Sequence, residues 1–229
     1  MKRICLSAAF IAVASFSFAQ VNMPMPSPTQ TIVQDFGMGK ITLVYSRPSV
    51  KGRTLFANNS DLAPFGKLWR TGANAATRIT FTDEVSVNGK KLDTGSYVIY
   101  TIPGEKEWTV ILNKGLENWG TDGYDEKQDI ARMNVPVNTV KPYTESFTMQ
   151  FTDIKNESCD LHLLWGNTDI KIPITTNIKD RLKAQIEKAL QGDKKPYWQA
   201  ANFYYEWEKD YAKALENVNK GIEGNADAF

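Results

Sequence analysis

The hydrophobic pattern of this chain changes from an alternating period to a helical period near residue 176. Before that point, apolar and polar residues alternate in short runs at 40–46, 78–82, 96–102, 108–112, 130–137, 147–151, 159–165 and 170–174. Alternation of this kind places every second side chain on one face of a strand. Turn signals separate the runs at intervals of about 8–12 residues. The pattern therefore predicts an antiparallel β-sandwich or jelly-roll-like domain over residues 31–175.

Asn88-Gly89 is the clearest turn signal in this region, because it follows the alternating residues Val85 and Val87. Both central residues of a type I′ turn need positive φ, which Asn and Gly tolerate, so a tight hairpin is expected here. A second connection, residues 166–168, is expected to join the last two strands as a turn. No helical period separates the runs, which argues against a parallel α/β fold.

After Thr176 the apolar residues recur at helical spacing, and the segment 178–229 is expected to be helical. Gly192 suits the end of a first helix and Pro196 the start of the next. The residues that follow have the spacing of one tetratricopeptide helix pair, namely Trp198, Ala201, Tyr205, Tyr211, Ala214, Val218 and Gly221. One such unit does not bury its apolar stripe alone. Three alternatives stay open: the helices dock on the β domain, they meet another protein, or the chain is truncated after Phe229.

Residues 1–19 are typical of a secretory signal peptide. Lys2 and Arg3 precede an apolar run, and Ser17 and Ala19 give the small-residue pattern for cleavage before Gln20. The run is too short for a membrane span, so none is expected after cleavage. Residues 20–30 are rich in proline and predict a tether. The pattern indicates export from a bacterial cell, to the periplasm or the exterior.

Cleavage changes the charge and the cysteine count. Without Lys2 and Arg3 the chain holds 25 basic against 26 acidic residues, and this near-neutrality argues against a nucleic-acid partner. Cys159 is then the one remaining cysteine, so no internal disulfide is expected.

The candidates for catalysis and metal binding are few. His162 is the sole histidine, which excludes a zinc site with two or three histidines from one chain. Cys159 and His162 lie three residues apart in a predicted strand, so they point to opposite faces and do not form a nucleophile–base pair. The acidic segment 119–129 lacks the spacing of a calcium loop and is interpreted as a solvated connection. No catalytic residue, metal or cofactor is predicted.

A basic loop between the predicted strands is the best candidate site. It contributes six candidate ligand-binding residues: Arg47, Lys51, Arg53, Trp69, Arg70 and Asn74. Guanidinium groups bind carboxylate, sulfate or phosphate with two parallel hydrogen bonds, and a tryptophan face suits a sugar. The alternative is structural: Arg47 and Arg70 pair with Asp83, Glu84 or Asp129 and hold the loop on the sandwich.

Three strings of the sequence resemble a bacterial family of exported proteins, domain of unknown function 2911, common in Bacteroidetes. They are S-R-P-x-x-K-G-R, then P-F-G-K-L-W-R-T-G-A-N-x-A-T, then V-N-G-K-K-L-x-x-G-S-Y-x-x-Y-T-I-P-G-E-K-E-W-T-V-I-L-N-K. The likeness covers about residues 31–175. It implies export and a frequent tetratricopeptide-like tail, and it implies no activity, substrate or catalytic residue.

Two functions are consistent with the sequence. The first is a non-enzymatic binding or scaffolding module of the cell envelope, in which the basic loop takes a small anionic or carbohydrate ligand and residues 178–229 meet a protein partner. The second is a hydrolase of envelope polysaccharide or peptide, with two carboxylates drawn from Asp83, Glu84, Asp122, Asp125 and Asp129. The scarcity of histidine and cysteine favours the binding module.

Overall fold

The computed structural model describes residues 23–224 of the chain. The predicted signal peptide, residues 1–19, and the alternative of a truncation after Phe229 lie outside the described residues. The segment 23–28 contains no helix or strand, and the first strand begins at Thr29, inside the range 20–30 that was predicted to be a tether.

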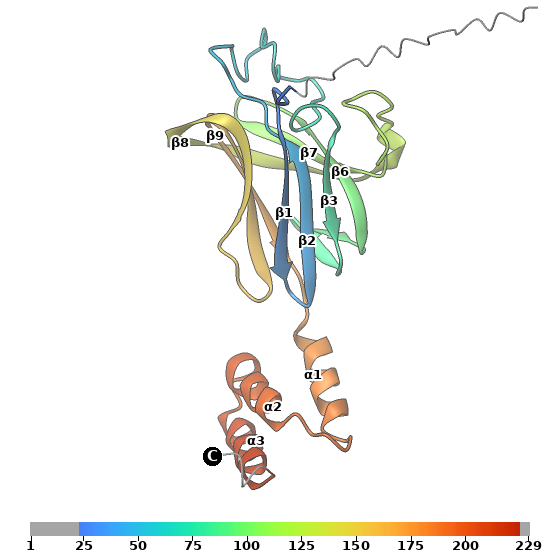
Figure 1. Ribbon diagram of the computed structural model, residues 1–229, viewed down its shortest axis with the longest axis vertical. Helices are drawn as coiled ribbons and strands as arrows, with labels where there is room; N and C mark the ends of the chain where they lie inside the picture. The colour runs from blue at the N-terminus through green and yellow to red at the C-terminus, as the bar shows by residue number, and fades with distance from the viewer. Residues whose placement is uncertain (1–22, 225–229) are drawn as a thin grey trace, which may run out of the picture.

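Nine strands form the body of the molecule (Figure 1). Their bounds are β1 Thr29–Phe36, β2 Gly39–Ser46, β3 Thr77–Phe81, β4 Val85–Val87, β5 Lys90–Leu92, β6 Gly95–Ile102, β7 Glu107–Asn113, β8 Asp129–Thr152 and β9 Ser158–Thr175. The strands follow the order β1-β2-β3-β6-β7-β8-β9-β4-β5, and every neighbouring pair is antiparallel. The prediction of a mainly β fold is confirmed.

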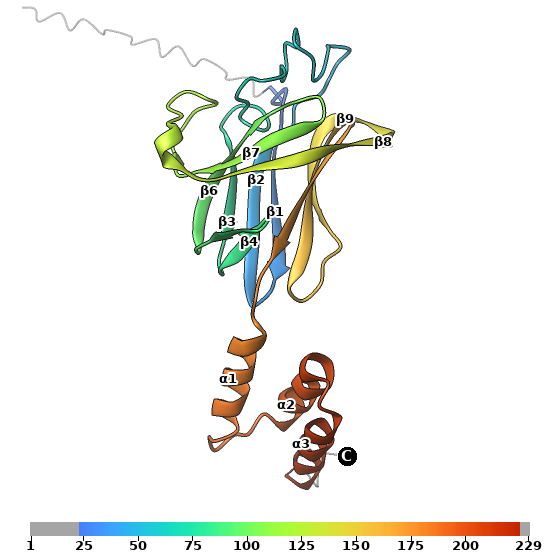
Figure 2. The ribbon, with the colours of Figure 1, turned by 180° about the vertical axis from the view of Figure 1, so that it is seen from behind.

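The sheet folds over on itself because β8 belongs to both halves of the body (Figures 1 and 2). The first part of β8 pairs with β7, and the later part pairs with β9. Alternating residues of both halves meet in one buried core, which includes Leu43, Trp108, Leu161 and Ile172. Burying these side chains removes apolar surface from water, which is the main stabilising term of such a core.

Two pairs of predicted strands are continuous in the structure. The runs 130–137 and 147–151 both belong to β8, and the runs 159–165 and 170–174 both belong to β9. The expected turn at 166–168 is instead a bend, because Gly166 and Thr168 still pair with β8 across two register shifts. Gly166 has φ +59°, a left-handed conformation that glycine adopts without strain.

The hairpin predicted at Asn88-Gly89 is confirmed. Asn88 and Gly89 have φ +44° and +79°, as a type I′ turn requires, and Val87 pairs with Lys90 across it. The inward residues predicted for β9 are confirmed as well, since Cys159, Leu161, Leu163 and Trp165 are all buried.

The helical segment follows β9 directly. It comprises α1 Lys179–Ala189, α2 Tyr197–Phe203, the π-helical η2 Tyr204–Glu208 and α3 Tyr211–Glu223. These elements share a small core of their own, to which Ile186, Phe203, Tyr204 and Ala214 contribute. The expected helices are therefore present. Ala201 and Ala214 of the apolar stripe are buried among them, whereas Trp198, Tyr205 and Tyr211 are exposed. The tetratricopeptide-like assignment stays a prediction.

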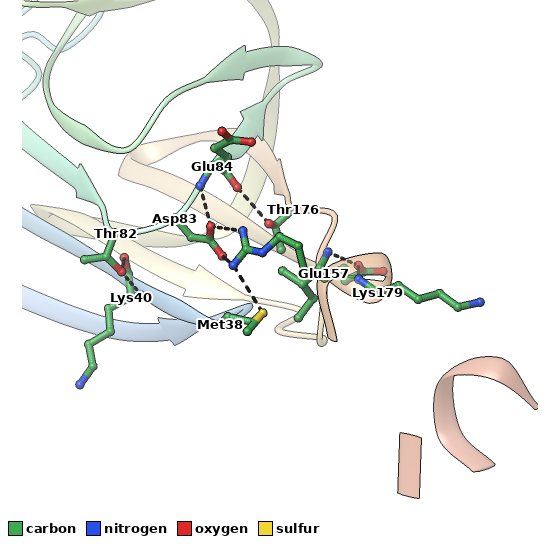
Figure 3. A network of polar contacts seen from close by, with 10 residues as sticks. Met38, Lys40, Thr82, Asp83, Glu84, Glu157, Thr176 and Lys179 are labelled. Carbon is green, nitrogen blue, oxygen red and sulfur yellow. Dashed lines mark hydrogen bonds and ion pairs between the residues drawn. The ribbon is translucent and has the colours of Figure 1, made fainter. Parts of the chain in front are cut away.

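The junction between the two parts is a polar network at the start of α1 (Figure 3). Arg181 donates to both carboxylate oxygens of Asp83, at 2.6 and 3.1 Å. A carboxylate oxygen of Glu157 accepts from the backbone N–H groups of Ile178 and Lys179, at 2.7 and 3.1 Å. Because the first N–H groups of a helix lack internal partners, Glu157 caps α1 from the β domain.

Candidate functional site

Four of the six predicted site residues line one pocket of about 260 Å³. These are Arg53, Trp69, Arg70 and Asn74. Trp165 of β9 and Ser27 of the segment before β1 also line it. The described lining residues include two arginines and no carboxylate. The pocket therefore combines positive charge with the absence of an internal counter-ion, which suits an anionic ligand.

A short turn after Trp69 places Arg70 and Asn74 at the pocket. Trp69 exchanges two backbone hydrogen bonds with Thr101 of β6, and the N–H of Thr77 donates to Arg70 O. Thr71 and Asn74 have φ +56° and +59°. Positive φ is uncommon outside glycine and is a genuine outlier for a β-branched residue. The sheet thus holds the turn in a conformation that the residues alone disfavour, and such strain is frequent at functional sites.

Gly72 lets this turn approach the edge of β2. A Cβ atom at Gly72 would lie 2.9 Å from Ser46 O, and the residue has φ +149°. Asn74 Nδ2 donates to Ser27 O at 3.1 Å and to Ser46 Oγ at 3.3 Å. The turn, β2 and the segment before β1 are therefore tied together at one rim of the pocket.

Most of the Arg70 guanidinium stays available to a ligand. Its Nη1 donates to Asn74 O at 2.9 Å, and its other nitrogens have no partner among the described residues. The group packs on the backbone of Gly120, where an added Cβ would lie 2.8 Å from Arg70 Cζ. Gly120 belongs to the β7–β8 loop, so two separate loops fix the position of this cation.

Two tryptophans form the floor of the pocket. The rings of Trp69 and Trp165 lie 5.5 Å apart at an interplanar angle of 15°, and Phe56 and Phe147 pack around them edge-on. Trp69 is 6% exposed and Trp165 is 1% exposed. These rings are core side chains that touch the pocket at their borders, and their faces are covered.

Arg53 lies between this pocket and a second one. Its Nε and Nη2 donate to Val50 O and Ser49 O, so its backbone partners hold it in the loop. The second pocket has a volume of about 400 Å³, and its lining includes Arg53, Phe65, Trp108 and Glu105. Because Glu105 brings a negative charge there, the smaller pocket is the better anion site.

The remaining two predicted residues lie outside the smaller pocket. Arg47 donates to Phe147 O at 3.0 Å and to Thr148 Oγ1 at 2.7 Å, and so attaches the loop to β8. The side chain of Lys51 is exposed, and its backbone N–H donates to Glu145. Arg47 therefore has the structural role that the sequence offered as an alternative, with β8 as its partner in place of an acid.

Two of the acids named as possible partners or catalysts, Asp83 and Asp129, form ion pairs away from the pocket. Asp83 pairs with Arg181 at the junction with α1, whereas Asp129 pairs with Arg132 at 2.7 Å. Asp129 also accepts from Tyr124 and Asn113, and burial together with this carboxylate raises the pKa of Tyr124 to about 12. Asp83 lies between β3 and β4, whereas Asp129 begins β8, and the two acids do not line a common pocket among the described residues.

The prediction that Cys159 and His162 point to opposite faces is confirmed. Cys159 is buried in the core, and burial raises its thiol pKa to about 12, so the thiolate is not formed near neutral pH. His162 lies on the outer face, where Nδ1 is 2.8 Å from a carboxylate oxygen of Asp169. The sequence analysis missed this pair, because residues seven apart point to opposite faces of a straight strand and these two meet only where β9 bends.

Comparison with protein-family models matches residues 27–174 to the family described as "Protein of unknown function (DUF2911)". No curated protein and no solved structure matches the chain. Among residues 23–224, no helix has both the length and the apolar character needed to cross a membrane.

Proposed function

Since the chain belongs to the DUF2911 family, whose description states no activity, we propose from the site geometry that it is an exported module that binds a small oxyanion. The ligand group is a carboxylate, sulfate or phosphate. The single observation that carries the proposal is the free guanidinium of Arg70 at a pocket whose described lining holds no carboxylate.

The position of Arg70 supports tight anion recognition. Its side chain is already held by Asn74 O and by the backbone of Gly120, so little rotamer freedom remains to be lost on binding. A charge-assisted hydrogen bond contributes roughly 1.5–3 kcal/mol. Arg53 adds a second positive charge at the same pocket, and Asn74 lines it too.

Burial of the tryptophans favours an oxyanion over a stacked neutral sugar. A sugar ring needs an open aromatic face, whereas Trp69 and Trp165 are covered by Phe56 and Phe147. The volume of about 260 Å³ also lies below the usual range of about 300–1,000 Å³ for small-molecule pockets. A compact charged group fits this space, with any larger portion of the ligand outside it.

Calorimetric titration with sulfate, phosphate and acetate at low ionic strength tests the proposal. Arg70→Gln is expected to weaken binding of the best of these anions about tenfold to a hundredfold, the equivalent of one charge-assisted hydrogen bond. Arg78→Gln is the matched control, because Arg78 donates to Leu116 O and does not line the pocket. An equal loss of anion affinity in both variants would mean that binding depends on the net charge and not on this pocket. An unchanged anion affinity in Arg70→Gln would refute the site.

Arg47→Gln separates attachment of the loop from binding. Its two hydrogen bonds to β8 are lost, so the melting temperature is expected to fall while the anion affinity is largely kept. Arg70→Gln has the opposite expected profile, with lower affinity and a nearly unchanged melting temperature. A fall in anion affinity for Arg47→Gln as large as for Arg70→Gln would instead place Arg47 in the site.

The helical segment supports the scaffolding part of the proposal. Tyr205, Tyr211 and Leu215 are 54%, 61% and 61% exposed, an unusual degree for large apolar side chains. Their exposure is consistent with a surface for a protein partner in the cell envelope. Tyr211→Lys with Leu215→Lys is expected to abolish cross-linking to an envelope protein without altering anion affinity. Unchanged cross-linking in this variant would show that this surface of the helices does not bind the partner.

A further inference from the structure

The bend of β9 brings together charged residues that are distant along the strand. Asp160 and His162 belong to the arm that pairs with the end of β8, and Asp169 belongs to the arm beyond Gly166. Across the bend, His162 contacts Asp169 at 2.8 Å and Asp160 contacts Lys171 at 2.7 Å. Five ionisable groups, with Asp153 from the end of β8, thus gather on the outer face of this ribbon.

Three of these groups form a metal-ligand set. One ring nitrogen of His162 and one oxygen each of Asp153 and Asp160 lie within 4.8 Å of one another. Ligand atoms around a tetrahedral zinc ion are about 3.4 Å apart at bond lengths of about 2.0–2.2 Å. The side chains therefore need to close by about an ångström, which the exposed Asp153 allows. Imidazole with carboxylates suits Zn²⁺ and its neighbours better than Mg²⁺ or Ca²⁺.

Asp169 distinguishes this set from a simple group of surface acids. The residue is 7% exposed and contacts Nδ1 of His162, which leaves Nε2 as the nitrogen for a metal ion. A carboxylate behind a histidine fixes the tautomer and orientation of the ring in most metal sites. The donor set thus has an outer-shell partner that is already in place.

Lys171 marks where the ion would lie. Its Nζ is 2.7 Å from Asp160 and 3.9 Å from Asp153, between the two carboxylates of the ligand set. The Lys171 side chain is 46% exposed, so it has room to turn toward solvent. A divalent ion bound there would place two positive charges beside these carboxylates, in place of the single charge of the Lys171 ammonium.

We propose that Asp153, Asp160 and His162 bind a divalent transition-metal ion of the zinc type. Asp169 positions the imidazole, and the ion displaces the Lys171 ammonium from the carboxylates. The sequence predicted no metal site, because the bend that assembles this one has no local signal. Water completes the coordination, so the site is open on one side.

The test is a calorimetric titration with Zn²⁺, as the sole added metal, of the protein that begins at residue 20. His162→Gln is expected to abolish binding. Lys171→Met is expected to tighten binding about fivefold or more, because the competing ion pair is gone. Lys141→Met is the matched control, since Lys141 is exposed and lies outside the cluster. Absence of binding by the unaltered chain, or equal affinity in His162→Gln, would overturn the proposal.

A test of the role of Asp169 requires a measurement that a change in folding stability does not affect. Asp169→Asn is expected to weaken Zn²⁺ binding about tenfold to a hundredfold and to change the visible absorption of bound Co²⁺. An unchanged Co²⁺ spectrum would refute the positioning role. Arg70→Gln should leave the Zn²⁺ affinity unchanged, because the metal site and the anion site share no residue; a loss in that variant would also count against the proposal.

Discussion

The position of the Arg70 side chain depends on a glycine in a different loop. Gly120 has φ +67°, and its Cα is covered by the Arg70 guanidinium. Neither Trp119, which is 64% exposed, nor Gly120 lines the pocket. Gly120 therefore affects the pocket only through the position of the Arg70 side chain.

Gly120→Ala is expected to displace Arg70 and to weaken anion binding about tenfold. The added methyl group would lie 2.8 Å from Arg70 Cζ, and the left-handed φ costs a further 1–2 kcal/mol, approximately, in stability. Gly89→Ala is the control, because Gly89 has φ +79° with no atom within 4 Å of a Cβ. Chemical denaturation should show a similar loss of stability in both variants. Weaker anion binding in both variants would contradict the role of the contact between Gly120 and Arg70.

Cys159 is expected to resist alkylation in the folded protein. Burial raises its thiol pKa to about 12, and the thiolate is the reactive form, so iodoacetamide at pH 8 should leave it unmodified. In protein prepared without residues 1–19, where Cys159 is the sole cysteine, guanidinium chloride should make labelling rapid. Mass spectrometry measures the outcome; rapid labelling of the native protein would contradict burial of this residue.

At the scale of elements, the helical segment depends on the β domain for its first turn. Glu157, from the β8–β9 connection, accepts from the first backbone N–H groups of α1, and Arg181 reaches back to Asp83. The Arg181 side chain of this ion pair is 47% exposed, and such a salt bridge contributes roughly 0–1 kcal/mol, whereas a cap contributes about 1 kcal/mol. The cap is therefore the stronger attachment.

Glu157→Ala is expected to loosen the start of α1 without unfolding the β domain. Removal of the cap leaves two N–H groups without a partner and costs about 0.5–2 kcal/mol locally. Hydrogen exchange of the Ile178 and Lys179 amides should accelerate, and protease should cut faster near residue 178. Glu187→Ala on the exposed side of α1 is the control, and equal exchange in the two variants would argue against capping.

At the scale of the whole molecule, the described residues form three hydrophobic clusters, one of which is a small group on β6 and β7 that comprises Val98, Tyr100 and Ile111. The largest cluster joins both halves of the folded sheet, and another lies among α1, α2, η2 and α3. The ion pair, the cap and the buried Ile178 connect them at the junction (Figure 3). The loop between β2 and β3, which carries most of the residues that line the proposed anion pocket, lies at the end of the β domain opposite the helices (Figure 1).

A chain that ends at residue 179 is expected to fold and to bind anions as well as the longer chain does. All lining residues of the pocket and the entire larger core lie before residue 176. The melting temperature of the β domain should change little, since the two cores share no residue. Circular dichroism and calorimetry measure both properties; loss of cooperative unfolding in the shorter chain would show that the cores are coupled.

Local signals in the sequence were sufficient for much of this fold. Asn88-Gly89 defined its hairpin because the turn chemistry is contained in two residues, and alternation placed Cys159 and Trp165 in the core. Alternation does not reveal where a strand bends, so the continuous course of β8 and β9 was missed. His162 and Asp169 meet only through that bend, and no spacing rule for a straight strand indicates the contact.

The site in the basic loop stays a prediction, of which the structure gives the geometry alone. Composition pointed to Arg53, Trp69, Arg70 and Asn74, which the structure brings to one pocket. It did not separate them from Arg47, because the partners of Arg47 are on β8, about a hundred residues later in the chain. Long-range contacts, and not residue type, decide which arginine lines the pocket and which holds a loop in place.

The indole N–H resonance of Trp69 is the most direct probe of the anion site. This group donates to Gly72 O at 3.1 Å beside Arg70, so a bound sulfate should shift its signal in a ¹⁵N-labelled sample. We predict that sulfate shifts the Trp69 signal of the unaltered protein, with half of the shift reached at the sulfate concentration of the calorimetric midpoint. The signal should not shift in Arg70→Gln. If sulfate left the Trp69 resonance unchanged and shifted that of the exposed Trp119, the result would contradict the account.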